Sequence, residues 1–265
     1  MTARRPKSPD RPLRPSEIAT ELRSRIASRD LPPGGKLPST KHLAEEFGAT
    51  ERAVYDAVAL LKATGHVIGH QGKGVFVRTN EPIEFHAHRF ERGQRRDDEQ
   101  PGLDDWQAGV LEQGRTPSQD IPAVSEEPAA TDIAAWLRIA PGTPVLARRR
   151  LRRADGEPYQ LADSYFPLEI ARDCPELSEE RDVSVPGGIL AYNGHPQSQL
   201  RDELRPWLPT PDESERLDLP KGFAGPAIQH VRIGYGGDAD GGIPVRVMVT
   251  IAPGHLNTIV YEMEV

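Results

Sequence analysis

Cysteine is nearly absent from this sequence: its 265 residues include one, Cys174. A single thiol excludes an intramolecular disulfide framework and any zinc site built from several cysteines. The sequence also has no apolar run of about eighteen residues, the length that a membrane-spanning helix needs. The start of the chain lacks the basic, apolar and small-residue regions of a signal peptide. We therefore expect a soluble, cytoplasmic protein with no membrane partner.

The net charge is −7, which at first sight argues against a nucleic-acid partner. The charge is divided unevenly, however. Residues 1–78 contain 14 Lys or Arg against 8 Asp or Glu, a balance of +6, and the remaining residues contain 19 against 32, a balance of −13. Such asymmetry is typical of a DNA-reading domain on an acidic body, because the acidic part repels phosphate and confines contact to the basic part.

Residues 15–78 are predicted to form three short helices and a two-stranded hairpin, because apolar residues recur at helical spacing in three segments. Ser39 and Thr50 are suited to cap the second and third helices, since a hydroxyl oxygen can accept a hydrogen bond from an otherwise unpaired backbone N–H. Gly48 permits the sharp reversal between these two helices. This order of elements predicts a winged helix-turn-helix, which lays its third helix in the major groove.

The hairpin tip carries Lys73 between two glycines, so its backbone can approach a polyanion closely. A generic helical domain with solvated Arg and Lys residues is the alternative. We expect Arg52 and Tyr55 to face bases and the other contacts to lie near phosphates or on the wing. The predicted DNA-binding residues are Ser39, Lys41, Thr50, Arg52, Tyr55, Gln71, Gly72 and Lys73.

Leu37-Pro38-Ser39, the helix that opens at Thr50, and the run from Gln71 to Val77 resemble the signature of GntR-family bacterial transcription regulators. The resemblance implies a DNA-binding domain over about residues 15–78. Thr50-Glu51 stands where the family usually has Ser-Arg, Tyr55 stands where it has a second Arg, and Arg52 lies one place beyond the first usual Arg. The docking mode is therefore implied, and the base preference at these positions is left open.

Two segments flank this domain. Residues 1–14 are rich in Arg and Pro and are predicted to be a disordered basic arm, which either contacts DNA phosphates or only aids solubility. The polar residues 79–102 are predicted to be a linker. Within it, His86 and His88 would share one side of a strand, a spacing that can hold a metal ion. No third ligand is evident nearby, so surface histidines are favoured and no metal or cofactor is predicted.

Residues 103–265 show helix and strand patterns in alternation. Arg150 and Gly156 align with Arg232 and Gly242, at offsets of 82 and 86 residues. The offset indicates two helix-plus-hairpin units that share one antiparallel sheet, an α+β fold. The predicted helices are 103–113, 131–137 and 213–217, and the predicted strands are 144–153, 159–166, 226–235, 245–252 and 259–265.

A linker followed by a pseudo-repeated body resembles the effector-binding domain of the HutC subfamily, the UTRA domain, whose fold is similar to chorismate lyase. The resemblance covers about residues 83–262. It implies a homodimeric regulator, most often a repressor in such families, that binds pseudo-palindromic operator DNA. It also implies that residues 103–265 bind a small-molecule effector and dimerise.

Five arginines crowd residues 148–153, and strand alternation places Arg148, Arg150 and Arg152 on one face. Three guanidinium groups repel one another unless an anion or carboxylates neutralise them, and Arg binds phosphate and carboxylate in a bidentate manner. The alternative to an anion is pairing with acidic residues of the adjoining hairpin. Those residues are Asp155, Glu157 and Asp163.

In HutC-type domains that bind amino-sugar phosphates, two arginines spaced as Arg150 and Arg152 lie in the effector pocket. Those relatives carry glutamates where this chain has Ala162 and Arg246. The resemblance therefore implies a more acidic ligand, with backbone N–H donors from the loop that contains Gly188. The predicted effector-binding residues are Arg148, Arg150, Arg152, Arg246 and Gly188.

Two other functions are considered. One is a DNA-binding regulator with a vestigial pocket, controlled by its abundance or by a protein partner. The other is a metabolite-binding or enzymatic body with a helical head. The sequence shows no nucleophile–base pair in a suggestive context, no phosphate-cradling glycine loop and no metal cluster. We therefore expect that the protein is not an enzyme.

Overall fold

The computed structural model of the protein describes residues 11–70, 72–79, 82–89, 103–185, 187–220, 223–237 and 242–263. The chain divides into two compact units. The first unit comprises Met1–Glu81 with Leu219–Gly225, and the second comprises Pro82–Asp218 with Pro226–Val265. Most of the predicted basic arm lies outside the described residues, as does the charged part of the predicted linker.

The first unit is the winged helix-turn-helix that the sequence predicts. Its elements are α1 (Pro15–Ala27), α2 (Thr40–Phe47), α3 (Glu51–Ala63), β1 (Val67–His70) and β2 (Gly74–Val77). The apolar stripes of the three helices meet in one core, because each helix alone leaves its stripe exposed to water. That core includes Ile18, Leu22, Leu43, Phe47, Val54 and Leu61.

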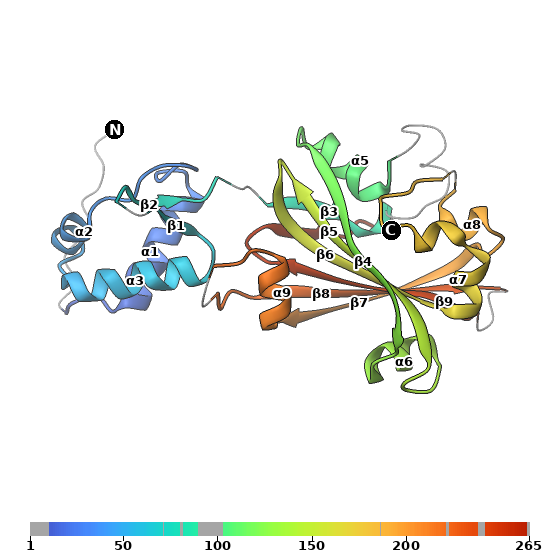
Figure 1. The fold of residues 1–265 in the computed structure, drawn as a ribbon. Helices are drawn as coiled ribbons and strands as arrows, with labels where there is room; N and C mark the ends of the chain where they lie inside the picture. The colour runs from blue at the N-terminus through green and yellow to red at the C-terminus, as the bar shows by residue number, and fades with distance from the viewer. Residues whose placement is uncertain are drawn as a thin grey trace. The chain divides into compact units, whose positions relative to one another are not determined.

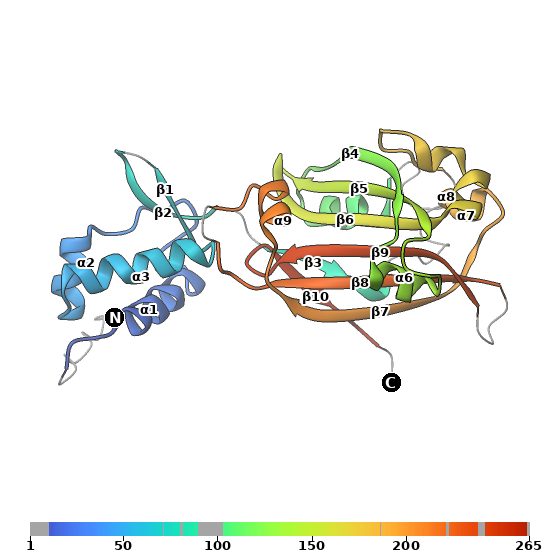
Figure 2. The ribbon, with the colours of Figure 1, turned by 60° about the horizontal axis from the view of Figure 1, so that its bottom comes forward.

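A six-stranded antiparallel sheet is the centre of the second unit, in the order β4-β5-β6-β9-β8-β7 (Figure 2). Its strands are β4 (Pro117–Pro128), β5 (Pro144–Ala154), β6 (Glu157–Pro167), β7 (Gln197–Trp207), β8 (Ala227–Gly236) and β9 (Ile243–Pro253). The order is symmetric about the β6–β9 pair. Each half contains a strand, a helix and a hairpin: β4, α6 (Thr131–Leu137), β5 and β6, then β7, α9 (Pro211–Arg216), β8 and β9.

The sequence predicted the helix and hairpin of each half but not the leading strands β4 and β7. Both strands form edges of the sheet, and nearly all of their residues are exposed or half-buried. Edge strands often carry charged side chains, which blunt unwanted pairing. Glu126 and Glu127 in β4 and Arg201 and Asp202 in β7 therefore mask the apolar alternation by which a strand is predicted.

The two faces of the sheet are covered by different elements (Figure 1). On one face α6 buries Ile133 and Leu137 against β5, β8 and β9. On the other face lie α5 (Asp105–Glu112) and a small parallel pair, β3 (Ile83–His86) with β10 (Asn257–Val260). The remaining short helices are η1 (Ala87–Arg89), α7 (Leu168–Asp173), η2 (Pro175–Ser178) and α8 (Ile189–Tyr192).

The segment predicted as a linker, 79–102, contains β3 and η1. Ile83 and Phe85 are buried, and β3 pairs with β10 at the other end of the sequence. The predicted last strand, 259–265, begins earlier, at Asn257, and ends at Val260. Each of these strands has four residues, too few for periodicity to mark their bounds.

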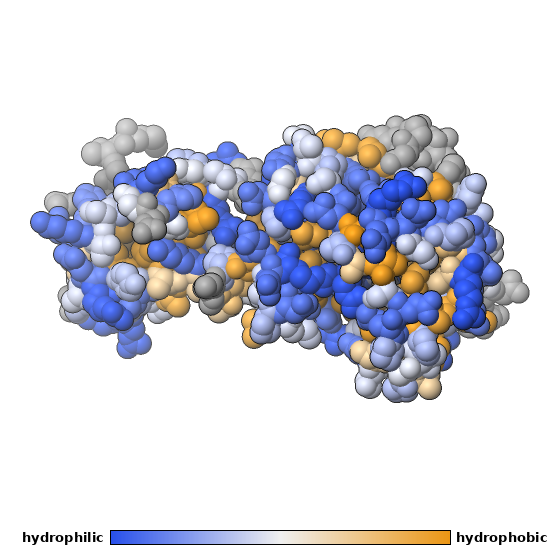
Figure 3. Space-filling view, viewed as in Figure 1, coloured by the Kyte–Doolittle hydropathy of each residue, from blue (hydrophilic) through white to orange (hydrophobic). Residues whose placement is uncertain are grey.

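Among the described residues, none of the helices is long and apolar enough to span a membrane. Figure 3 shows polar residues over most of the displayed face, with apolar surface in small separate areas. Cys174 is fully buried in a cluster with Leu146, Phe166 and Leu177. Burial raises the pKa of its thiol to about 11, so this cysteine has the character of a core residue.

A buried ion pair fastens β7 to β8. The guanidinium of Arg232, which is 1% exposed, donates to both carboxylate oxygens of Asp202 at 2.7 Å, and His230 Nε2 lies 2.9 Å from the same carboxylate. Burial alone would raise the pKa of Asp202, but the hydrogen bonds from Arg232 and His230 outweigh it and hold the pKa well below its ordinary value.

Replacing Asp202 by Asn should destabilise the protein by about 3–5 kcal/mol, because Arg232 then stays buried without its counter-charge. A depressed carboxyl pKa stabilises the fold above the unfolded-state pKa of about 3.9, and this contribution is lost as pH falls toward the folded-state pKa. In urea titrations, the difference between wild type and Asp202→Asn should therefore be full at pH 7 and shrink below about pH 5. Asp120→Asn is the control, since the Asp120–Arg153 pair lies at the surface and is worth at most about 1 kcal/mol. Equal losses from both variants at pH 7 would contradict this assignment.

Candidate functional site

Local capping builds the helix-turn-helix. The hydroxyl of Ser39 accepts from His42 N at 3.2 Å, and that of Thr50 accepts from Ala53 N at 3.2 Å. Each bond satisfies one unpaired N–H at the start of α2 or α3. Between the helices Gly48 has φ 59°, the left-handed region that favours glycine. Ser39 and Thr50 therefore fix the two helix starts, and this role is independent of any phosphate contact.

The outer side of α3 carries Arg52 and Tyr55. Tyr55 is 61% exposed, and the Arg52 guanidinium lies 5.5 Å from the centre of its ring. Asp56, one turn further along α3, binds the same guanidinium at 3.1 Å through two atom pairs. The structure thus brings Arg52 and Tyr55 together on an exposed face, where Asp56 orients the guanidinium. Lys41 is exposed near the start of α2.

The wing is the β1–β2 hairpin. Gly72 and Gly74 have φ values of 73° and 117°, so the tip needs glycine, and Lys73 is exposed between them. Lys36 also belongs to the wing: it pairs with Phe76, and its ammonium lies 5.9 Å from the centre of the Phe76 ring. The sequence analysis missed Lys36, because only the folded chain places it beside the hairpin. Gln71, predicted to bind DNA, lies outside the described residues.

Paired residues of an antiparallel sheet lie on the same face. Arg148 of β5 pairs with Ser164 of β6, and this row of side chains continues through β9 to Arg232 of β8. Because side chains alternate along a strand, Arg150 and Arg152 lie on the same face as Arg148. We call this side of the sheet, which α5 and the β3–β10 pair cover, the arginine face.

The other two arginines of β5 bind carboxylates of the edge strand β4. Arg149 lies 3.0 Å from Glu127, and Arg153 lies 2.8 Å from Asp120. Two of the alternative partners considered from the sequence, Asp155 and Asp163, pair with other arginines through their carboxylates. Asp155 binds Arg115, and Asp163 accepts two bonds from Arg216 at 2.7 and 2.8 Å.

Arg148 is 3% exposed and donates to backbone carbonyls of the segment that follows η2. It reaches Leu177 O at 3.0 Å and Arg181 O at 2.6 Å, and it also binds Glu179 O. Burial, together with the nearby Arg150, lowers the pKa of Arg148 to about 10. Arg148 therefore fastens a covering loop to the sheet.

Arg152 is 1% exposed and is held by α5. Its guanidinium lies 5.3 Å from the centre of the Trp106 ring and 3.5 Å from the carboxylate of Asp104, which caps α5. Gln119 of β4 accepts from its Nε at 3.0 Å. These contacts compensate for burying the positive charge of Arg152, which lies beneath α5.

Arg150 lies where the pairing of β5 with β6 is locally altered. The register runs through Arg148↔Ser164 and resumes at Leu151↔Leu161. Between these pairs Asp163 Oδ1 accepts from Arg150 N at 3.2 Å, and the Arg150 guanidinium donates to Ala162 O at 3.2 Å and to the hydroxyl of Ser164 at 2.6 Å. Arg150 is half-buried, the most accessible of the three β5 arginines on this face.

Several buried polar atoms on or beside the arginine face have no hydrogen-bond partner among the described residues. They are Thr250 Oγ1 on β9, Gln160 Oε1 on β6 and Trp106 Nε1 on α5. Thr250 pairs with Ala162, opposite Arg150, and Gln160 pairs with Arg152. A buried polar group without a partner costs about 1–3 kcal/mol, so such atoms mark a place where water or a ligand can bind.

Arg246 and Gly188 were also predicted to contact the effector. Arg246 lies on β9 opposite Gly234 of β8, half-buried. Gly188 has φ 87° and precedes α8, and its N–H donates to Val185 O at 3.0 Å. This donor is therefore already used within its own loop.

Comparison with known proteins identifies both units. Residues 15–77 match the family described as "Bacterial regulatory proteins, gntR family", and residues 112–239 match the family described as "UTRA domain". The first is the helix-turn-helix unit, and the second spans the sheet from β4 to the end of β8. A DNA-binding domain joined to an effector-binding domain defines a transcription regulator. The chain carries a GntR-type DNA-binding domain followed by a UTRA domain, and the UTRA domain is consistent with the HutC subfamily.

Relatives and a solved structure agree with this assignment. The HTH-type transcriptional regulator RB1450 of Rhizobium meliloti is 28% identical over 63% of this chain and 64% of its own length. The HTH-type transcriptional repressor NagR of Bacillus subtilis is 26% identical over 84% of this chain and 90% of its own. The crystal structure of PhnF from Mycobacterium smegmatis shares the fold, with a TM-score of 0.56, 19% identity, and coverage of 93% of this chain and 99% of that chain. The names of the two relatives point to transcription regulation.

Arg52→Ala should weaken binding to an operator by about 1–3 kcal/mol and relax specificity at one base position, as loss of a base contact does. Lys73→Ala should weaken binding to all sequences alike and reduce its salt dependence, as loss of a phosphate contact does. Both effects can be measured by fluorescence anisotropy, with DNA selected by the full-length protein from a random pool. Arg201→Ala, an exposed arginine of β7, is the matched control. If Arg52→Ala leaves both affinity and specificity unchanged, Arg52 does not face a base.

Proposed function

We propose that this protein is a ligand-responsive transcriptional repressor that binds a pseudo-palindromic operator as a homodimer and is released from it by a small anion. The arrangement of Arg52, Tyr55 and the wing supports the DNA-binding part. The printed name of NagR, a transcriptional repressor that aligns over most of both chains, supports the sign of regulation. Reading operator DNA also implies that the protein works in the cytoplasm.

The homodimer follows from the geometry of DNA. One α3 helix reaches only a few base pairs, and a two-fold symmetric protein reads two half-sites on the same side of the duplex. An effector controls such a protein only through its different affinity for the DNA-competent and incompetent states, commonly about 1–3 kcal/mol. The effector therefore acts on the arrangement of the two DNA-binding units.

We place the effector at the arginine face, with Arg150 as its main contact. Arg150 is the least buried of the three β5 arginines there, and Thr250, which pairs with Ala162 on the neighbouring strand, carries a buried hydroxyl without a hydrogen-bond partner. Arg246 is a further cationic contact. Arg152 contributes its positive charge rather than a direct contact, because its guanidinium already donates to Gln119 and Asp104. Arg148 is less suited to bind a ligand directly, because its guanidinium already donates to three backbone carbonyls.

The proposed arginine contacts favour a strongly acidic ligand over a simple amino-sugar phosphate. Such a ligand is a dicarboxylate, an acidic phosphometabolite or another oxyanion. Ala162 and Arg246 offer no carboxylate to accept hydrogen bonds from sugar hydroxyls. An arginine fork instead favours ligands that present two oxygens in one plane.

A specific observation favours a second function. Arg148 and Arg152 are both satisfied by protein groups, so the arginine face is stable without a ligand. These internal contacts of Arg148 and Arg152 are consistent with a regulator whose pocket is vestigial. Such a regulator is controlled by its abundance or by a protein partner. The response of the protein to anions separates the two functions.

A panel of oxyanions and phosphometabolites should contain compounds that raise the melting temperature of the full-length protein. A ligand at a hundredfold its dissociation constant stabilises the protein by about 2.7 kcal/mol. Arg150→Ala should abolish this stabilisation and leave operator binding intact, whereas Arg153→Ala, on the opposite face of β5, should leave both unchanged. Thr250→Val should reduce the anion effect without destabilising the free protein, because it removes a hydroxyl that lacks a partner. If no anion shifts the melting curve, the vestigial-pocket function is favoured. If an anion does so and Arg150→Ala changes nothing, Arg150 is a structural residue and not the anion contact.

Operator spacing tests the homodimer. Inserting about five base pairs between the half-sites places them on opposite sides of the duplex, since one helical turn has about 10–10.5 base pairs. Affinity should fall toward the non-specific level, typically about 10³-fold weaker or more, and an insertion of a full turn should be less harmful. If the five-base-pair insertion and the full-turn insertion both leave affinity unchanged, each subunit binds its half-site independently.

A further inference from the structure

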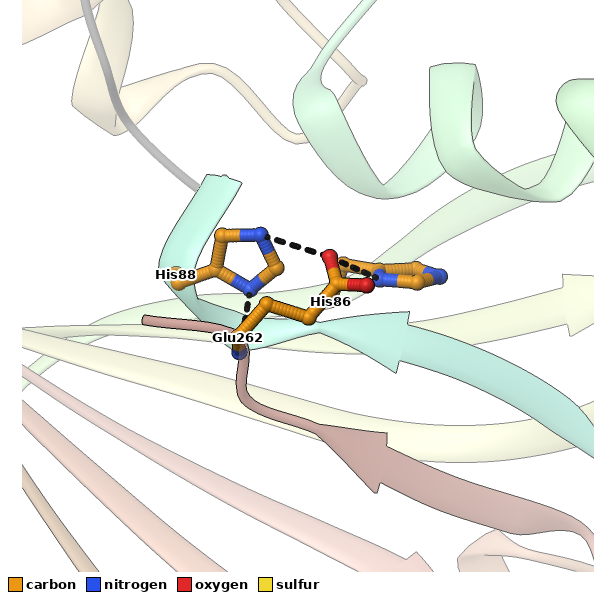
Figure 4. A group of neighbouring side chains, drawn as sticks. All are labelled: His86, His88 and Glu262. Atoms are coloured by element: carbon orange, nitrogen blue, oxygen red, sulfur yellow. Dashed lines mark hydrogen bonds and ion pairs between the residues drawn. The ribbon is translucent and has the colours of Figure 1, made fainter. Parts of the chain in front are cut away.

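His86 and His88 lie where β3 passes into η1, near the start of the second unit. The sequence analysis predicts both histidines on one side of a strand, with no third metal ligand nearby. In the structure β3 ends at His86, and the turn of η1 brings the two ring centres to 5.9 Å. Glu262 follows β10, which pairs in parallel with β3, and its carboxylate thereby reaches both rings (Figure 4).

Three potential ligand atoms converge there. Glu262 Oε2 lies 3.1 Å from His88 Nε2 and 3.7 Å from His86 Nδ1, and one ligand atom of each residue lies within 4.8 Å of the others. Ligand atoms bound to tetrahedral zinc at about 2.0–2.1 Å are separated from one another by roughly 3.3 Å. The two distances from Glu262 to the histidines are close to that separation, and the two histidine nitrogens lie within 4.8 Å of each other, so side-chain rotations can bring all three atoms onto one ion.

His86 is oriented as a metal-binding histidine. Its Nε2 lies 3.6 Å from the carboxylate of Glu84, which favours a proton on that nitrogen. Its Nδ1 is buried and has no hydrogen-bond partner among the described residues, and it faces Glu262. Metal-ligating histidines commonly present one nitrogen to the ion and the other to a carboxylate or carbonyl, and Glu84 is close enough to become that outer partner after a small movement.

The backbone between the two histidines is held by a hydrogen bond from the central sheet. Ala87 is 3% exposed, and its carbonyl accepts from the buried Arg232 at 2.9 Å. Arg232 is in turn held by Asp202. A rigid support of this kind lowers the entropic cost of collecting ligands around an ion.

We infer that His86, His88 and Glu262 form a binding site for a divalent first-row transition-metal ion, with Zn²⁺ as its best probe. Two imidazole nitrogens and one carboxylate suit zinc and its neighbours rather than Mg²⁺ or Ca²⁺, which prefer oxygen ligands. Three protein ligands leave a coordination position for water or another donor. The ion ties the segment after β10 to the first strand of the effector unit.

Metal binding also changes a hydrogen bond at this site. His88 Nδ1 accepts from Glu262 N at 3.2 Å, so in the neutral ring the proton lies on Nε2 and faces the Glu262 carboxylate. Coordination at Nε2 requires that proton to move to Nδ1, and the backbone N–H of Glu262 then loses its acceptor. The segment that carries Glu262 therefore exchanges a hydrogen bond for a metal bond.

Isothermal titration of the full-length protein, with any affinity tag removed, should show one Zn²⁺ bound per chain, and Co²⁺ should give the visible absorption of a bound ion. His86→Ala and Glu262→Gln should each weaken binding at least about tenfold, since even an outer-shell partner typically contributes about 10–100-fold. Excess Mg²⁺ should not compete. His195→Ala is the control, because His195 pairs with Asp173 elsewhere in the second unit.

Glu262→Gln keeps the size and polarity of the side chain, and melting curves without metal should confirm that each variant folds. One Zn²⁺ per chain that is weakened by His86→Ala and Glu262→Gln but not by His195→Ala supports the site. The absence of saturable Zn²⁺ binding to the wild type, or equal affinity in all variants, would overturn it. Because this readout is independent of DNA and of anions, it does not depend on the function proposed above.

Discussion

Burying a guanidinium group costs several kcal/mol unless its charge and its donors are satisfied, and one face of the central sheet buries three of them. Arg148 binds the carbonyls that follow η2, Arg152 binds Trp106 and Asp104 of α5, and Arg232 binds Asp202 and the carbonyl of Ala87. Each arginine therefore fastens a different covering segment to the sheet. The arrangement of those segments depends on these contacts as much as on apolar packing.

This constraint also shapes the site. A charged side chain whose donors are all used cannot bind a ligand without breaking its own contacts, so burial divides the arginines of β5 by role. Arg148 and Arg152 hold the covering segments in place. Arg150 is half-buried and donates to Ala162 O and to the hydroxyl of Ser164, and it is the arginine that we propose as the anion contact. Rigid neighbours on both sides of such a contact favour selective binding.

The same frame supports the histidine cluster. The contact of Arg232 with Ala87 fixes the turn between His86 and His88, and the β3–β10 pair brings Glu262 to them. The proposed anion site and the proposed metal site therefore rest on the same face of one sheet. The same unit would then bind an anion at one site and a metal ion at the other.

The sequence by itself determined the DNA-binding unit, because helix periodicity, the caps at Ser39 and Thr50 and the glycine turns depend on residues only a few positions apart. It also determined both central hairpins, because the two strands of each are close in the sequence and have a clear strand pattern. The tertiary structure decided the edge strands, which arginines are buried, and the approach of Glu262 to His88, 174 residues away. Such contacts depend on how the whole sheet packs, and no local pattern encodes the partner that a strand or a charge will meet.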